Sequence, residues 1–127
     1  MLVLLAVVGP LSAGCQSAAT REPSLVKTEL YFGLSRSSGP DVTEREWREF
    51  VDTRIAPQFP SGLTIIDAAG QHLSKARALV RERSKLVILV YPPTAEADAA
   101  IDAIRRDYVR RFEQEAVLRV TVPVGGR

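Results

Sequence analysis

The sequence predicts an α+β domain with a four-stranded antiparallel sheet and two helices on one face of that sheet. Three observations lead to this fold class. A strand near residue 26 alternates with period two, a helix opens with a capping box at Thr43, and a second helix follows an apolar strand that ends at Tyr91. With 127 residues, 46% of them hydrophobic and 25% charged, the chain has the composition of one globular domain.

The first strand is predicted over residues 26–34. One face carries Val26, Thr28, Leu30, Phe32 and Leu34, and the other carries Lys27, Glu29, Tyr31 and Gly33. Residues 35–40 are rich in Ser, Gly and Pro and predict a loop.

The first helix begins at Thr43, the N-cap, because Glu46 three residues later completes a capping box. Val42 and Trp47 are placed to form a hydrophobic staple. The buried stripe at helical spacing consists of Trp47, Phe50, Val51 and Ile55. Pro57 is expected to end this helix.

The second half of the domain repeats this scheme. We predict a second strand over residues 63–68, extending toward Gln71, and a connection over 73–78. A third strand over residues 80–91 is apolar on both faces in its second half, which is typical of a central strand. Thr94 caps a second helix, and residues 116–122 form a fourth strand. The buried stripe of that helix consists of Ala97, Ala100, Ile101, Ile104, Tyr108 and Phe112.

The order β-α-β-β-α-β predicts the ferredoxin-like arrangement, a sandwich whose second sheet face is open. Because the third strand is apolar on both faces, we expect part of the open face to be covered, for example by a sheet-to-sheet homodimer.

Residues 1–14 have the pattern of a cleaved leader: an uncharged apolar run, too short to span a bilayer, followed by small residues. The segment Leu11-Ser12-Ala13-Gly14-Cys15 resembles the lipobox of bacterial lipoproteins, which predicts lipidation of Cys15. It departs from that pattern at Ser12, where Leu is commonest, and the usual basic start of a leader is missing. We therefore expect the true start codon to lie upstream.

Residues 15–24 predict a polar tether that reaches at most about 30 Å and would hold a domain over residues 25–124 near a membrane. The expected location is the cell envelope, on the periplasmic face of a membrane. The alternatives are secretion with Cys15 as a free thiol and a buried N-terminal helix, although Gly9-Pro10 argues against a long helix.

Four groups of residues carry a family resemblance: the run 27–33, the segment 59–71, the run 82–85 and the segment 108–119. They read K-T-E-L-Y-F-G, F-P-x-G-L-T with D-A and G-Q, E-R-S-K, and Y-x-x-R-F-x-Q-E-x-V-L-R. Together they resemble a family of small bacterial secreted proteins and lipoproteins whose domain has no known function. His72 stands where a tryptophan is expected, and residues 73–78 have little of the family's sequence pattern. The resemblance implies export and one compact domain, and it implies no activity.

The candidate site is a polar group on the open sheet face: Glu29, Tyr31, Glu82, Ser84 and Arg119, with Asp67 and Gln71 able to approach from the second strand. A shift of one residue would replace Glu82 and Ser84 by Arg83 and Lys85. The structural alternative is a set of cross-strand pairs that fix the strand register.

Several classes of function are disfavoured. A net charge of +2, from 17 basic and 15 acidic residues, does not indicate nucleic acid binding, and the four arginines at 105, 106, 110 and 111 alternate with acids. The single histidine, His72, predicts neither a metal site nor a catalytic base, and no motif predicts a cofactor or catalytic residues. The lack of such motifs disfavours an enzymatic function.

Three classes of function stay open. A binding or assembly accessory with a protein partner predicts an exposed apolar patch. A small enzyme, with its site on the open face or at a dimer interface, predicts a closed polar pocket. A structural surface lipoprotein predicts neither.

Overall fold

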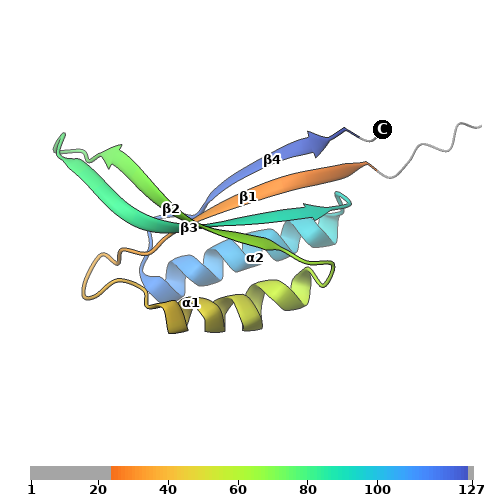
Figure 1. Ribbon diagram of the computed structural model, residues 1–127, viewed down its shortest axis with the longest axis horizontal. Coiled ribbons are helices and arrows are strands. Elements are labelled where there is room, and N and C mark those ends of the chain that lie inside the picture. Colours follow the sequence, from red (N-terminus) through yellow and green to blue (C-terminus); the bar gives the residue numbers. More distant parts are fainter. Residues whose placement is uncertain (1–23, 126–127) are drawn as a thin grey trace, which may run out of the picture.

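The computed structural model describes residues 24–125, so the predicted leader and Cys15 lie outside the described residues. The element order is β1 (Leu25–Gly33), α1 (Glu44–Phe50), β2 (Thr64–Leu73), β3 (Leu79–Tyr91), α2 (Ala95–Phe112) and β4 (Leu118–Val124). The strands lie in the order β2-β3-β1-β4, and β1–β3, β1–β4 and β2–β3 all pair antiparallel. Both helices cover the same face of the sheet (Figure 1). The predicted fold class is confirmed.

The two helix starts follow from local side-chain chemistry. The Thr43 hydroxyl accepts a hydrogen bond from the backbone N–H of Glu46 at 3.3 Å, and the Glu46 carboxylate accepts the N–H of Thr43 at 2.9 Å. These reciprocal bonds satisfy N–H groups that an open helix end leaves unpaired. Thr94 caps α2 in the same way, by accepting from the N–H of Ala97 at 3.1 Å.

The first helix does not keep α geometry up to Pro57. After Phe50 it continues as a π-helical turn, η1 (Val51–Ile55), and a 3-10 turn, η2 (Ala56–Gln58). The predicted apolar stripe is nevertheless buried throughout, with Phe50 and Ile55 both 0% exposed. Pro57 lies at the start of the 3-10 turn, where its missing N–H removes no helical hydrogen bond.

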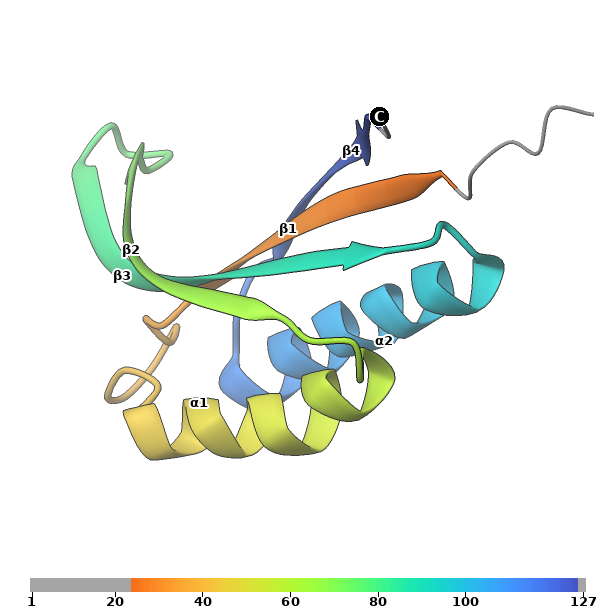
Figure 2. The same ribbon diagram turned by 45° about the vertical axis from the view of Figure 1, so that its right-hand side comes forward.

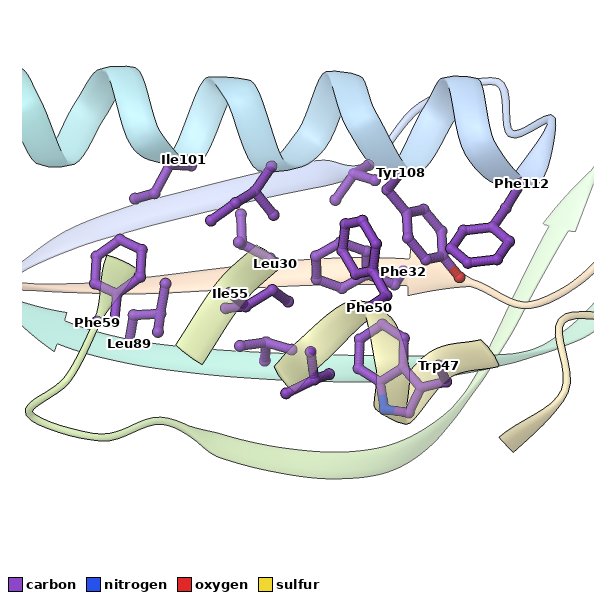
Figure 3. Packing of buried hydrophobic residues seen from close by; sticks show 14 of the residues in the cluster. Leu30, Phe32, Trp47, Phe50, Ile55, Phe59, Leu89, Ile101, Tyr108 and Phe112 are labelled. Atoms are coloured by element: carbon purple, nitrogen blue, oxygen red, sulfur yellow. The ribbon is translucent and has the colours of Figure 1, made fainter. Parts of the chain in front are cut away.

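Aromatic side chains form the centre of the core between sheet and helices (Figure 3). The ring of Phe32 lies 4.7 Å from that of Tyr108, 5.2 Å from that of Trp47 and 6.2 Å from that of Phe50, measured between centroids. The Tyr108 hydroxyl donates to the carbonyl of Gly33 at 2.8 Å, which ties α2 to the end of β1. Leu30 and Phe32 therefore face the helices, as the alternation predicts.

Two strand boundaries differ from the sequence-based prediction. β2 and β3 extend beyond the helices as a two-stranded ribbon, because their pairing continues to Leu73 and Leu79. Figure 2 shows this hairpin curving away from the helix layer. β4 begins at Leu118, and Val117 before it packs into the core at 1% exposure. Within residues 24–125, no helix is long and apolar enough to cross a membrane.

Candidate functional site

Four of the five predicted site residues lie on the open face, the side of the sheet away from the helices. Glu29 and Tyr31 alternate with the buried residues of β1, so their side chains point away from the core. Glu82 and Ser84 do the same on β3, and Ser84 pairs with Gly33 across the two strands. The alternative register is wrong, since Lys85 is buried at 4% exposure on the helix side.

The placement of Arg119 on the open face is wrong. Arg119 pairs with Leu30, whose side chain is buried beneath the helices. Its guanidinium lies 2.5 Å from Asp98 and 3.7 Å from Asp102 on α2, so it is a sheet-to-helix contact. Burial lowers the pKa of Arg119, but its bond to Asp98 and the negative charges of Asp98 and Asp102 together outweigh this effect, so the net pKa is raised.

Asp67 and Gln71 do not approach the open face either. Asp67 pairs with Lys85 and binds its ammonium at 2.5 Å on the helix side of β2. Gln71 pairs with Arg81 and accepts a hydrogen bond from its Nε at 3.0 Å. Both residues therefore contribute cross-strand contacts rather than site groups.

The predicted polar group is divided into two parts. In the first part, Glu29 accepts the Tyr31 hydroxyl at 2.8 Å and pairs with Lys27 at 2.9 Å, all along β1. The bonds from Lys27 and Tyr31 lower the pKa of Glu29, and the bond to Glu29 raises the pKa of Tyr31. These three residues, the polar row, neutralise one another and present no unpaired group.

The second part lies in a hollow of about 600 Å³, open to solvent, at the end of the open face. Gly33, Gly70 and Ser84 belong to its lining, and their small side chains leave space where larger residues cover the rest of the face. Further lining residues come from the loop after β1 (Ser35, Arg36, Ser37), the ribbon (His72, Glu82), α2 (Arg105), the α2–β4 connection (residues 113–117) and the first residue of β4 (Leu118). Tyr31 lies at its border with the polar row.

Two acceptor oxygens meet above Gly33 in this hollow. A Cβ on Gly33 would lie 3.0 Å from Gln114 Oε1 and 3.1 Å from Glu82 Oε2, so both side chains would have to move by a few tenths of an ångström to make room for it. Glycine at position 33 therefore leaves room for both side chains to lie close to the strand. Glu82 also covers Gly70, because its Cγ atom would lie 3.6 Å from a Cβ built on that glycine.

Arg36 supports one wall of the hollow. Its guanidinium pairs with Glu46 at 2.6 Å and lies 5.6 Å from the centre of the Phe112 ring. The bonds from the Thr43 backbone, from Arg36 and from the Thr43 hydroxyl lower the pKa of Glu46 to about 2. The Nε atom of Arg36 is buried and has no hydrogen-bond partner among the described residues.

Apolar side chains flank the polar row on both sides. Lys27 lies between Val90 and Val122, Glu29 between Ile88 and Val120, and Tyr31 between Leu86 and Leu118. We call the most exposed of the open-face apolar residues the apolar patch, namely Ile66, Val90, Leu118, Val120, Val122 and Val124, which are 38% to 61% exposed. An apolar surface that gathers on one sheet face is typical of an interaction site.

Sequence reasoning missed the residues that shape the hollow. Gly33, Gly70 and Gln114 all stand in the motifs that carry the family resemblance, and two glycines on the open face of the sheet were the available signal. His72 lines the hollow as well. No group of three His, Cys, Asp or Glu residues within residues 24–125 could hold a metal ion.

The strand order, the antiparallel pairing and the two helices on one face define a ferredoxin-like α+β domain. The chain belongs to the family described as Protein of unknown function (DUF3574), whose model matches residues 27–125. No curated protein matches the chain.

Solved structures of distant sequence share the fold. A phage SAM lyase in complex with S-methyl-5'-thioadenosine has a TM-score of 0.60 at 14% identity, over 82% of this chain and 91% of that one. The phage SAM lyase in the apo state has a TM-score of 0.61 at 15% identity, over 93% and 87%. CutA from Synechococcus elongatus PCC7942 has a TM-score of 0.50 at 12% identity, over 79% and 76%. At these identities the likeness concerns the fold alone.

Proposed function

We propose that the protein is a lipid-anchored binding module of the cell envelope, which holds a partner protein on the open face of its sheet. The observation that carries this proposal is the apolar patch, because exposed Val and Leu side chains on a sheet gain free energy when a partner removes them from water. The polar row is internally neutralised, so the partner needs an apolar, uncharged surface rather than a complementary charge.

A photo-crosslinking residue at Val120 tests this docking surface in the living cell. Val120 is 39% exposed on the open face, and Ala99, exposed on the outer side of α2, is the matched control position. We expect a covalent adduct with another protein from position 120 and none from position 99. An adduct of twice the chain mass would instead identify a second copy as the occupant. Absence of any adduct at 120 would contradict the proposal.

The proposal of a lipid anchor is based on the leader-like run that ends in Ala13-Gly14-Cys15. Cells labelled with an alkyne fatty acid test it, with Cys15→Ser as the variant. We expect label on the original chain and none on the variant, and equal labelling of both would remove the anchor from the proposal. Without lipidation, the same domain would act as a secreted binding module.

The hollow favours a second candidate, a small enzyme or ligand-binding protein with its site at the end of the open face. The observation behind it is the pair of acceptor oxygens above Gly33, which is unlike the self-neutralised polar row. Turnover of a bound small molecule would support the enzyme, and binding without turnover would leave a ligand-binding protein. A structural surface lipoprotein, the third alternative, would show neither an adduct at 120 nor a ligand.

A further inference from the structure

The orientation of Gln114 fixes which of its atoms faces the hollow. Its amide nitrogen donates to the carbonyls of Ser35 at 2.7 Å and Phe112 at 3.1 Å. Because carbonyl oxygens only accept, the amide cannot be flipped, and Oε1 is the atom that lies above Gly33. Two oxygens that can only accept therefore lie within about 3 Å of the same point above Gly33, and no group in residues 24–125 donates to either of them.

The charges around the hollow are unequal. Both lining arginines are already paired, Arg36 with Glu46 at 2.6 Å and Arg105 with Asp102 at 3.2 Å. Arg105 also donates to the carbonyl of Val117 at 3.0 Å. The lining carboxylates Glu82, Glu113 and Glu115 have no ion pair with any residue of the described range. Glu113 accepts hydrogen bonds from the hydroxyls of Ser37 and Ser38, which are uncharged. A positively charged ligand is thus favoured over an anion.

We propose that the hollow binds a small organic cation, whose primary ammonium or guanidinium group donates to Glu82 and to Gln114 Oε1. This deepens the second candidate above and is independent of the lipid anchor and of the apolar patch. A volume of about 600 Å³ suits a small molecule. An ammonium group has three N–H donors and a guanidinium has five, so either can satisfy both oxygens at once. A metal ion is disfavoured, because the described residues do not supply three ligands together.

The test is an NMR titration of the full-length ¹⁵N-labelled chain in detergent with n-butylammonium, agmatine and spermidine. Butanol and butyrate are the neutral and anionic controls, and Mg²⁺ is the metal control. We expect saturable shifts at the amides of Gly33, Gly70 and Gln114 for at least one amine. Glu82→Gln should weaken the affinity at least about tenfold, the usual effect of losing a charged hydrogen bond.

Two further variants keep the test decisive if Glu82→Gln perturbs the fold. Gly33→Ala places a methyl group within about 3 Å of both oxygens and is expected to weaken the same binding. Asp52→Asn removes one exposed carboxylate on the helix layer and should leave binding unchanged. The proposal is overturned if no amine shifts these amides, if butanol or Mg²⁺ shifts them equally, or if Glu82→Gln binds like the original chain.

The same titration separates this inference from the proposed functions. Val120→Lys should leave amine binding intact while it disrupts protein docking. Conversion of the bound amine, followed in its own proton spectrum, would indicate the enzyme. Binding without conversion would support the cation site and contradict the enzyme.

Discussion

The Lys85 ammonium lies 2.8 Å from Glu44 Oε2, which joins the middle of β3 to the first turn of α1. The same ammonium lies 2.5 Å from Asp67 Oδ1 on β2. The side chain of Lys85 is 5% exposed, whereas those of Glu44 and Asp67 are 48% and 81% exposed. The bond from Lys85 lowers the pKa of both carboxyls. Burial lowers the pKa of Lys85, and the bonds to Asp67 and Glu44 reverse this and raise it.

We predict that Lys85→Ala lowers the unfolding free energy by about 2 kcal/mol, because it removes a buried aliphatic stem. Lys85→Met keeps most of that packing and leaves no buried charge unpaired, since both acidic partners are exposed. Its cost should stay below about 1 kcal/mol. Denaturant unfolding of the two variants measures this. Equal losses would show that the ion pairs, and not the stem, stabilise this position.

Acid should destabilise the protein partly through Glu46. Its pKa is depressed in the folded state from 4.5 to about 2, so its contribution is complete above pH 4.5 and is lost as the pH falls toward 2. Glu46→Gln removes this titration and should flatten the dependence of stability on pH within that window. Thermal melts at pH 2.5, 3.5, 4.5 and 6 compare the two chains. Parallel curves would contradict the assignment.

We predict that Thr43→Ala lowers the unfolding free energy by about 1 kcal/mol, because N–H groups at the start of α1 lose their acceptor. Thr53→Ala is the matched control, since the Thr53 hydroxyl donates to the carbonyl of Glu49 within the helix and caps nothing. An unchanged denaturation midpoint in Thr43→Ala would mean that the helix starts elsewhere.

Arg119→Met should destabilise the domain by about 1 kcal/mol and leave amine binding in the hollow unchanged. The reason is that Arg119 bonds to Asp98 and Asp102 on the helix side. Unfolding curves together with the amine titration check both parts. Loss of amine binding without loss of stability would instead show that Arg119 takes part in ligand binding.

Glu82→Gln should raise the unfolding free energy by up to about 1 kcal/mol, because the new amide adds a donor close to Gln114 Oε1, which accepts no hydrogen bond from residues 24–125. Such a gain is expected of a residue kept for binding rather than for stability. Asp52→Asn, which removes one exposed carboxylate elsewhere, should not produce it. A destabilised Glu82→Gln would falsify the view that the protein itself supplies no donor to these oxygens.

The sequence predicts those parts of the fold in which local chemistry and burial agree. In β1, Leu30 and Phe32 are apolar and buried, and their polar neighbours face outward, so alternation assigns the faces of Glu29 and Tyr31 correctly. In α1, the capping box marks the first turn without any tertiary information. The π-helical turn after Phe50 has no comparable local signal, because its buried stripe fits an ordinary helix equally well.

The face of Arg119 could not be predicted, because β4 reverses the usual rule of polar side chains outward. Leu118 and Val120 point to the open face, while Arg119 meets the acidic side of α2. The apolar residue that enters the core there is Val117, one position before the strand. The sequence did not predict the hollow, because its shape depends on Gly33 and Gly70. Glycines have no side chain, so they mark the hollow only by the space that they leave open.

Pro123 lies within β4, a strand at the edge of the sheet, opposite Val26. A proline has no N–H, so a strand of another chain that arrives at this edge meets an interruption in the hydrogen-bond ladder. The valines around it would otherwise make β4 a template for strand-by-strand addition. Pro123→Val should therefore favour fibril growth from this edge. Pro123 thus allows the sheet face to remain apolar while the edge of the sheet resists strand addition.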